Sequence, residues 1–304
     1  MSSTPLLHGI IVRAQSGFFG VQTDRGLIVA KLRGRLTQGL RTTDAAAVGD
    51  RVQVRLLEDG SGAIEAVEPR ARVLSRKAPG QRREVEQVIV ANPDQAVLVF
   101  ACADPDPNFR MLDRFLVVAE REQIPALLCV NKVDLVERRS AKRAFADYER
   151  LGYDVIFTSA KTGRGVGELR GRMRRRLSVL AGPSGVGKSS LLNAIQPGLG
   201  LRVREVARAT GRGRHATVVP ELVPLEGGGY VADTPGLRAL DLWDIEPQEL
   251  DAYFRELRPL VEHCDFSDCS HVHEPGCAVI EAVEKGEVSE QRYESYLRMR
   301  LGEE

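Results

Sequence analysis

Residues 178–195 read SVLAGPSGVGKSSLLNAI, and this stretch decides the fold. The apolar run Ser178–Ala181 predicts a buried strand, and the pattern after the turn predicts a helix over Lys188–Ile195. The turn between them matches G-x-x-x-x-G-K-[ST] at every fixed position, in the strand–turn–helix context that this phosphate-binding motif needs. Glycines let backbone N–H groups turn inward around phosphate oxygens, and the helix N-terminus adds positive potential. The stretch therefore predicts a phosphate loop rather than a chance glycine-rich turn.

The roles within this loop follow from its chemistry. We expect Lys188 to reach the β- and γ-phosphates of a nucleotide and Ser189 to ligate Mg²⁺. The loop by itself does not distinguish ATP from GTP. The residues assigned to nucleotide binding here are Gly182, Pro183, Ser184, Gly185, Val186, Gly187, Lys188, Ser189 and Ser190.

Strand and helix patterns alternate on both sides of the loop, over residues 84–240. This alternation predicts a doubly wound α/β domain with a mainly parallel sheet. Ligands of such sheets bind at the carboxyl ends of the strands, where the remaining motifs fall. The other predicted strands are Gln95–Cys102, Ala126–Val130, Asp154–Phe157 and Gly229–Ala232, and the other predicted helices are Arg110–Gln123, Ser140–Leu151 and Gly165–Arg176.

Two motifs at strand ends predict a guanine pocket. The Asp134 carboxylate can accept hydrogen bonds from guanine N1–H and the exocyclic amine, whereas adenine presents an acceptor at N1 and would leave it unpaired, at a cost of about 1–3 kcal/mol. Asn131 is expected to brace neighbouring loops, and Lys132 to cover one face of the base. The first motif is Asn131-Lys132-Val133-Asp134, and the second is Ser159-Ala160-Lys161, whose loop can offer a backbone N–H to guanine O6. Either motif alone is weak evidence for a guanine pocket, because NKxD also fits an ordinary polar turn. The two motifs together are much stronger evidence.

A third group of residues predicts the Mg²⁺ and hydrolysis chemistry. Asp233 and Gly236 belong to a DTPG motif, in which the carboxylate suits Mg²⁺ and the glycine amide suits the γ-phosphate. Thr217 is expected to close over Mg²⁺ when triphosphate is bound. Leu237 occupies the position where many GTPases place a water-orienting glutamine, and leucine cannot orient water. His215 is the nearest candidate for that catalytic role; a polar loop residue or an RNA contact is an equal alternative.

The order of these motifs along the chain is unusual. In an ordinary GTPase the motifs occur in the order phosphate loop, switch threonine, DxxG, NKxD and SAK. In this chain NKxD, at residue 131, is the first of these motifs and DxxG, at residue 233, is the last. The domain is therefore predicted to be circularly permuted. Because the segment after Gly236 leads directly into the C-terminal region, we expect the nucleotide state to bias the position of that region.

The N-terminal residues 1–72 differ from the rest of the chain in their predicted secondary structure. Short β-rich pieces separated by Gly and Asp turn signals predict a small closed barrel of SH3 or OB type. Residues 73–83 (VLSRKAPGQRR) are predicted to be a basic linker. The expected barrel strands are His8–Arg13, Phe18–Gln22, Leu27–Leu32, Val52–Leu57 and Ala63–Pro69.

Residues 241–304 are predicted to be helical around a metal site. Helical patterns cover Pro247–His263, Ala278–Glu284 and Ser289–Arg300. Three thiolates and one imidazole at close spacing suit a tetrahedral, structural Zn²⁺, which would stabilise a tail too small for a large core. His273 is a competing ligand. The expected ligands are Cys264, Cys269, His271 and Cys277.

Composition limits the protein class. The chain has 304 residues with 43 basic and 42 acidic side chains, so its net charge of +1 gives no global signal for polyanions. The apolar run 96–101 is far shorter than the roughly 20 residues that span a bilayer. The N-terminus MSSTPLLHGI lacks the charged and apolar regions of a signal peptide. We therefore expect a cytoplasmic protein of two or three domains.

Taken together, the motifs resemble one family: the circularly permuted, ribosome small-subunit-dependent GTPases of the RsgA type. The resemblance covers nearly the whole chain and depends on the permuted order and on four segments, GPSGVGKSSLLN, GRGRHAT, DTPG and CDFSDCSHVHEPGC. It implies a multidomain α/β protein with an N-terminal OB-fold, a central GTPase domain and a C-terminal zinc domain. It also implies a cytoplasmic factor that acts late in small-subunit maturation and binds ribosomal RNA.

The resemblance further implies that the small subunit stimulates GTP hydrolysis, and it aligns His215 with a histidine proposed to assist. One departure is that Ala216 and Val218 flank a single Thr217, where the family usually has a run of threonines. Two other functions remain open: a GTP-sensing RNA-binding scaffold in which hydrolysis is incidental, and a P-loop ATPase or kinase. Expected partners are GTP or GDP and the small subunit with its rRNA. No membrane is expected, and the chain is expected to be a monomer.

Overall fold

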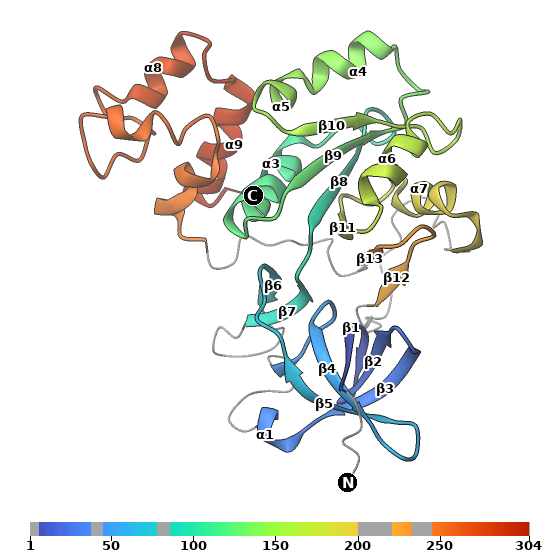
Figure 1. The fold of residues 1–304 in the computed structure, drawn as a ribbon. Coiled ribbons are helices and arrows are strands. Elements are labelled where there is room, and N and C mark those ends of the chain that lie inside the picture. Colours follow the sequence, from blue (N-terminus) through green and yellow to red (C-terminus); the bar gives the residue numbers. More distant parts are fainter. Residues whose placement is uncertain (1–5, 38–44, 78–85, 200–220, 233–244, 304) are drawn as a thin grey trace, which may run out of the picture. The chain divides into compact units, whose positions relative to one another are not determined.

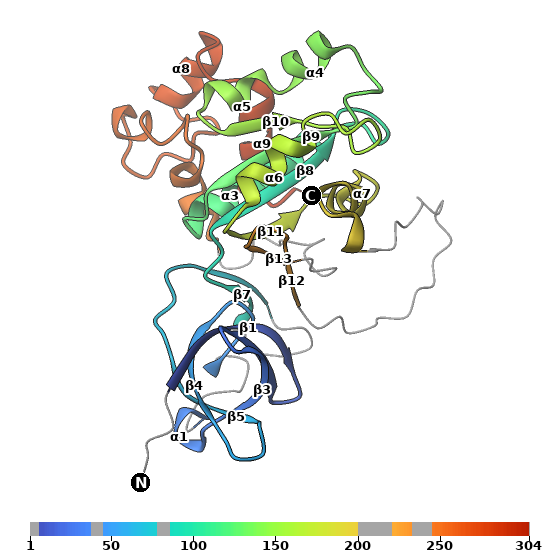
Figure 2. The same cartoon turned by 45° about the vertical axis from the view of Figure 1, so that its right-hand side comes forward.

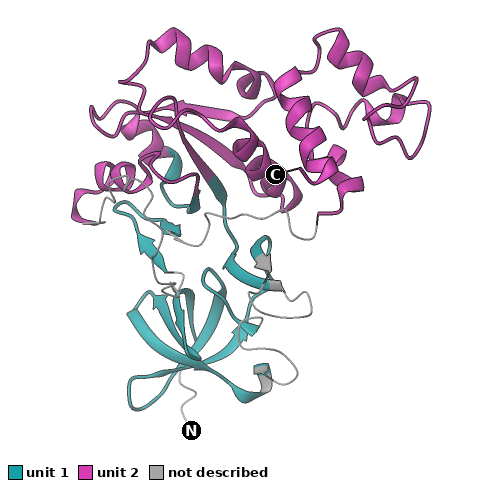
Figure 3. Cartoon of the chain, turned by 180° about the vertical axis from the view of Figure 1, so that it is seen from behind, with its two compact units in different colours: residues 1–96, 172–180, 208–237 teal, residues 97–171, 181–207, 238–304 magenta. Residues whose placement is uncertain are grey.

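The computed structural model of this chain describes residues 6–37, 45–77, 86–199, 221–232 and 245–303 (Figure 1). Figure 2 gives a second view of the same ribbon. Figure 3 distinguishes two units, each of which has its own dense internal contacts. Unit 1 comprises residues 1–96, 172–180 and 208–237, and unit 2 comprises residues 97–171, 181–207 and 238–304.

The N-terminal strands form a closed barrel in the order β1-β2-β3-β5-β4, which confirms the prediction of five strands and a barrel. The pairing is antiparallel except between β3 and β5, which run parallel. This Greek-key arrangement is of OB type. Alternate residues point inward, and Ile11, Val21, Val54 and Ile64 are fully buried. The strands are β1 (Leu6–Gln15), β2 (Phe18–Thr23), β3 (Gly26–Leu32), β4 (Arg51–Leu56) and β5 (Gly62–Val67), and a short helix α1 spans Gly34–Thr37.

A two-stranded antiparallel sheet follows the barrel, formed by β6 (Val73–Lys77) and β7 (Glu86–Ala91). Residues 73–77 fall in the stretch that the sequence predicts as a linker. They form a strand because Leu74 is buried and pairs with the equally buried Val90. The rest of the predicted linker, residues 78–83, lies outside the described residues.

The remaining strands form a six-stranded sheet in the order β10-β9-β8-β11-β13-β12. β9 and β10 pair in parallel, as do β11 and β13, and β12 is antiparallel to β13, so the sheet is mainly parallel as predicted. β8 and β11 are buried along their whole length, as expected for strands covered on both faces. The strands are β8 (Gln95–Ala101), β9 (Ala126–Asn131), β10 (Asp154–Phe157), β11 (Leu177–Ala181), β12 (Leu222–Pro224) and β13 (Tyr230–Ala232).

The helices of this region agree with the predicted ones except at one point. The single helix predicted over Ser140–Leu151 is two helices, because the buried Phe145 has a non-helical backbone and caps both. Asn108 caps the first helix, its side chain accepting a hydrogen bond of 3.0 Å from the Met111 amide. The helices are α3 (Phe109–Arg121), α4 (Arg138–Ala144), α5 (Ala146–Arg150), α6 (Val166–Met173), α7 (Lys188–Ile195) and the 3₁₀ turn η1 (Pro197–Leu199).

The C-terminal region differs from the prediction in its first half. The continuous helix predicted over Pro247–His263 is replaced by two 3₁₀ helices, η2 (Pro247–Tyr253) and η3 (Val261–His263). Pro259 lies between them and lacks the N–H that a continuous helix requires. The other two predicted helices are present as α8 (Ala278–Glu284) and α9 (Glu290–Leu301). None of the helices in the described ranges is both long and apolar enough to cross a membrane.

A buried arginine joins α9 to α3, which run side by side in Figures 1 and 2. Arg292 is 1% exposed, and its guanidinium donates to Asp113 Oδ1 at 2.5 Å and to Glu256 Oε1 at 2.6 Å. The Tyr148 hydroxyl donates to the same Asp113 oxygen at 2.8 Å. The ring of Phe254 lies 4.6 Å from the guanidinium carbon. These contacts fix the C-terminal region on α3 and α5.

Replacing Arg292 with alanine should strip the countercharge from two buried carboxylates, which costs about 3–5 kcal/mol. We expect hydrogen exchange in η2 and α9 of Arg292→Ala to accelerate accordingly. The matched control is Arg298→Ala, which removes a surface pair with Glu294 and should cost only about 0–1 kcal/mol. Equal exchange rates in the two variants would contradict this role for Arg292.

Candidate functional site

The phosphate loop leaves β11 and enters α7, and two of its glycines are required by geometry. Gly182 has φ +142°, and a Cβ there would lie 2.1 Å from the backbone oxygen of Val99. Gly187 has φ +94°, and a Cβ there would lie 2.4 Å from Asn131 Nδ2. The Lys188 ammonium donates to the backbone oxygens of Gly182 and Pro183, both at 2.7 Å. The loop therefore curls around its own lysine at the N-terminus of α7, as a phosphate site requires.

The side chain of Asn131 connects this loop to the two others expected to form the pocket. Asn131 ends β9 and is 2% exposed. Its Nδ2 donates to the backbone oxygen of Val186 at 2.8 Å. Its Oδ1 accepts from the Ala160 amide and from the Thr158 hydroxyl, both at 3.2 Å. The structure thus brings the NKxD, SAK and phosphate loops together at one amide group.

The side of the site that the sequence predicts to recognise the base is arranged around Asp134. The Ser159 hydroxyl donates to Asp134 Oδ1 at 2.6 Å and itself accepts from the Thr162 amide at 3.1 Å. The hydrogen bond from Ser159 holds the pKa of Asp134 below its ordinary value of 3.8. The exposed carboxylate is therefore ionised at neutral pH, and an ionised carboxylate only accepts hydrogen bonds. A ligand edge with two adjacent N–H donors matches it.

A segment that sequence reasoning did not assign to the site supports the same loop. The Cys102 amide donates to the Asn131 backbone oxygen at 3.0 Å, and its thiol donates to the Lys132 backbone oxygen at 3.1 Å. The Lys132 ammonium contacts the backbone oxygen of Asp104 and lies 3.6 Å from its carboxylate. Lys132 has φ +62°, a left-handed conformation in which these contacts hold it. The sequence marks Cys102 only as the end of an apolar run, so no local signal reveals this support.

The residues expected to complete the site on the Mg²⁺ and γ-phosphate side are not part of the described structure. His215, Thr217, Asp233 and Gly236 all lie outside the described residues. Ser189, the other expected Mg²⁺ ligand, is the second residue of α7 and is half-buried.

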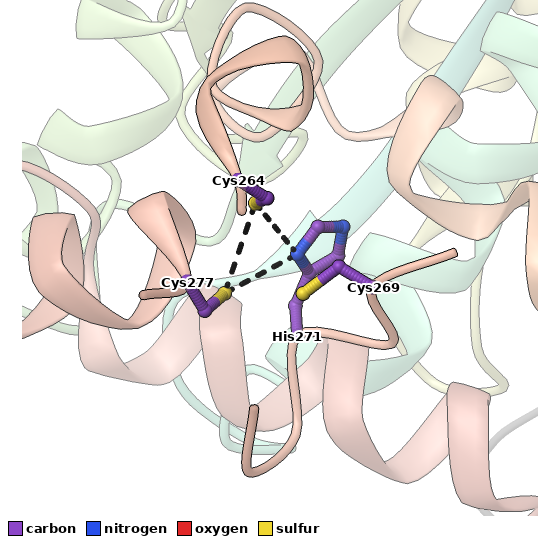
Figure 4. A group of neighbouring side chains, drawn as sticks. All are labelled: Cys264, Cys269, His271 and Cys277. Atoms are coloured by element: carbon purple, nitrogen blue, oxygen red, sulfur yellow. Dashed lines mark hydrogen bonds between the residues drawn. The ribbon is translucent and has the colours of Figure 1, made fainter. Parts of the chain in front are cut away.

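The four predicted metal ligands converge in the C-terminal region (Figure 4). Their ligand atoms all lie within 4.8 Å of one another. Cys264 Sγ lies 4.0 Å from Cys277 Sγ, and His271 Nδ1 lies 3.6 Å and 3.4 Å from these two sulfurs. A tetrahedral ion with metal–sulfur bonds of about 2.3 Å places its sulfur ligands roughly 3.8 Å apart. The spacing of Cys264, Cys269, His271 and Cys277 is therefore close to that of the ligands of one tetrahedral ion.

The loop that carries His271 is held on both sides by groups the sequence did not reveal. The Glu274 carboxylate accepts from the amides of Ser270, Val272 and His273 at 2.7–3.1 Å. Burial raises the pKa of Glu274, but hydrogen bonds from the Ser270 hydroxyl and these amides outweigh it and hold the pKa below its ordinary value.

On the other side of this loop, two tyrosines of α9 hold its backbone. The Tyr293 hydroxyl donates to the His271 backbone oxygen at 2.6 Å, and the Tyr296 hydroxyl donates to the Ser270 backbone oxygen at 2.9 Å. The i, i+3 spacing of the two tyrosines on one helix face is the only sequence signal of this contact.

The fold and the convergence of these loops define a class of protein: a P-loop GTPase whose motifs occur in circularly permuted order. Comparison with known families agrees. The model of the RsgA GTPase family matches residues 67–243, and the model of the RsgA N-terminal domain matches residues 8–64. The chain belongs to the RsgA GTPase family.

Curated and solved relatives cover almost the whole chain. A protein of Gemmatimonas aurantiaca named small ribosomal subunit biogenesis GTPase RsgA is 48% identical over 295 residues, which is 96% of each chain. The crystal structure of YjeQ from Thermotoga maritima matches with a TM-score of 0.81 and 40% identity, covering 98% of this chain and 99% of that one. YloQ, described as a circularly permuted GTPase, matches with a TM-score of 0.76 and 34% identity, covering 99% and 96%. These comparisons confirm the predicted GTP-hydrolysing enzyme, its fold and its permutation.

Asn131→Ala should weaken GDP binding by about 10- to 100-fold, because it leaves the Val186 oxygen and the Ala160 amide without partners, at roughly 1–3 kcal/mol. Fluorescence titration with a labelled GDP measures the change. Asn108→Ala is the matched control: it removes the cap of α3 and should leave the affinity unchanged. An Asn131→Ala protein with wild-type affinity would show that the shared amide does not organise the pocket.

Proposed function

We propose that this GTPase acts in the biogenesis of the small ribosomal subunit, binding the subunit and its rRNA during late maturation. The observation that carries the GTP-binding part of the proposal is the Asn131 side chain, which joins the phosphate loop to the loop at 159–161. The ribosomal part is supported by family membership, since the matching relatives bear the name of small ribosomal subunit biogenesis GTPases. The RNA role draws further support from the OB-type barrel, a fold that binds oligonucleotides.

In this proposal, guanine is recognised by Asp134, whose carboxylate accepts from N1–H and the exocyclic amine. The loops at residues 131–134, 159–161 and 182–190, together with Gly236, contact the nucleotide. Water attacks the γ-phosphate directly, since phosphoryl transfer of this class depends on positioning and charge stabilisation. His215 orients that water. Ser189, Thr217 and Asp233 would hold the Mg²⁺ that accompanies GTP, which would neutralise phosphate charge.

We also propose that the cluster of three cysteines and His271 holds one Zn²⁺ with a structural role. Four protein ligands complete a tetrahedron and leave no open position for catalysis. Binding of such an ion stabilises the fold of a small region, because the unfolded chain holds no preformed site. The spacing of the ligand atoms, all within 4.8 Å of one another, supports this assignment.

The proposed organisation has four parts: a barrel over residues 1–72, a basic linker over 73–83, a GTPase domain over 84–240 and a zinc-binding domain over 241–304. The linker range includes β6, which ends at Lys77. We propose that the protein acts as a cytoplasmic monomer and that the nucleotide state is coupled to the zinc-binding domain.

A second function, that of a GTP-sensing scaffold with incidental hydrolysis, is favoured by Leu237, which stands where a glutamine would orient water. Single-turnover GTP hydrolysis with and without purified small subunits separates the two. We expect the subunits to accelerate hydrolysis by several orders of magnitude, because accessory groups that complete a GTPase site raise the rate about 10³–10⁵-fold.

The His215→Ala protein should lose most of this acceleration and keep its affinity for GTP. Hydrolysis that small subunits leave unchanged would favour the scaffold.

Asp134→Asn should shift preference from GTP toward xanthosine triphosphate, because the carboxamide N–H₂ donates to the carbonyl that replaces the guanine amine. Competition binding at pH 7.5 measures the ratio of the two affinities. Since the pKa of Asp134 lies below its ordinary 3.8, its carboxylate should stay ionised and able to accept from the guanine edge from pH 8 down to about pH 5. Asp106→Asn, an exposed change in a neighbouring loop, should leave the preference as it is. An Asp134→Asn protein that still prefers GTP would refute the contact.

A further inference from the structure

The imidazole of His271 has two nitrogens, and the structure gives each a different partner. Nδ1 faces the sulfurs of Cys264 and Cys277, at 3.6 Å and 3.4 Å, as Figure 4 shows. Nε2 lies 3.2 Å from Oδ2 of Asp251, a residue of η2 that is 20 positions away in the sequence. The ring therefore presents one nitrogen to the metal cluster and the other to a carboxylate.

We infer that Asp251 is a positioning residue of the metal centre, which fixes the ring and tautomer of His271 for metal binding. This inference depends on the Zn²⁺ site proposed above. A metal-ligating histidine commonly donates its other N–H to a carboxylate, and this partner orients the ring and makes the ligating nitrogen more basic. With the proton on Nε2, the lone pair of Nδ1 is directed at the cluster.

The local geometry shows that Asp251 is itself held for this role. Its Oδ1 accepts from the Ala252 amide at 2.7 Å, so the carboxylate cannot rotate without losing a backbone contact. The His271 side chain is 0% exposed and that of Asp251 is 17% exposed, so the hydrogen bond between them is largely shielded from water. Tyr296 packs against the imidazole, with ring centroids 6.1 Å apart. The acceptor and the ring are thus both constrained by contacts within the protein.

The position of η2 in the chain gives this contact a wider consequence. η2 begins at Pro247, eleven residues after Gly236 of the DTPG motif. The residues that follow η2 are bound to α3 and α9: Arg255 donates to Glu120 of α3 at 2.6 Å, and Glu256 accepts from Arg292 of α9 at 2.6 Å. The Asp251–His271 hydrogen bond therefore joins η2 to the metal-binding cluster, and metal binding should stabilise η2.

The test compares full-length Asp251→Ala, Asp251→Asn and Asp268→Asn proteins in competition for Zn²⁺ with a chelator at fixed pH. Asp251→Ala removes the acceptor, and we expect its Zn²⁺ affinity to fall by about 10- to 100-fold. Asp251→Asn keeps an oxygen acceptor without the charge, so its Zn²⁺ affinity should fall by a smaller factor. Asp268 is an exposed acid beside Cys269, so Asp268→Asn should bind like the wild type. The absorption spectrum of Co²⁺-loaded protein reports the same ligand set independently of affinity.

Hydrogen exchange supplies a second readout. In Zn²⁺-loaded Asp251→Ala protein, residues 247–253 should exchange faster than in the wild type, while α7 should be unchanged. If Asp251→Ala does not fold, Zn²⁺ affinity and hydrogen exchange are compared between the Asp251→Asn protein and the wild type. Zn²⁺ affinity and exchange equal to the wild type in both Asp251 variants would overturn the inference and leave the metal proposal standing. A wild-type protein that binds neither Zn²⁺ nor Co²⁺ would overturn both.

Discussion

One buried carboxamide, that of Asn131, is the constraint on which the nucleotide site depends. Its amide group donates to the phosphate loop and its oxygen accepts from the loop that follows β10. Each group would be costly to leave unpaired in the interior, so the three loops can only be placed together. The close approach of Gly187 to Asn131 Nδ2 adds a steric reason for glycine at the start of α7. The loop predicted to bind phosphate and the loops predicted to recognise the base are thereby joined in one arrangement.

This constraint explains why circular permutation leaves the site intact. The contacts of Asn131 join strand ends, and they do not depend on which strand comes first in the chain. What permutation changes is the connection out of the domain, which now runs from the DTPG motif to η2 and the metal cluster. The C-terminal region is held on α3 and α5 by Arg292 and Arg255. Removing one partner of a buried ion pair leaves the other charge uncompensated, so the contacts of Arg292 hold the C-terminal region firmly on α3.

The elements that the sequence predicted well are those with local signals. Buried strands such as β8 and β11 are short apolar runs, and the phosphate loop and the cysteine cluster are motifs of fixed spacing. The differences arise where partners are distant or a single residue decides. Pro259 interrupts the continuous helix predicted over Pro247–His263, and Phe145 divides the one predicted over Ser140–Leu151. Asp113 and Arg292 form an ion pair although they are 179 positions apart in the sequence. Asp251 and His271 likewise pair through the fold, and nothing in either segment alone indicates the other.

The most direct measurement of the central claim is a crystal structure of the protein with a nonhydrolysable GTP analogue and Mg²⁺. The account predicts one nucleotide, with its guanine edge on the Asp134 carboxylate, its phosphates at Lys188, and the Asn131 hydrogen bonds to Val186 and Ala160 retained between them. A nucleotide whose base lies away from Asp134 while its phosphates occupy the glycine-rich loop would contradict the account.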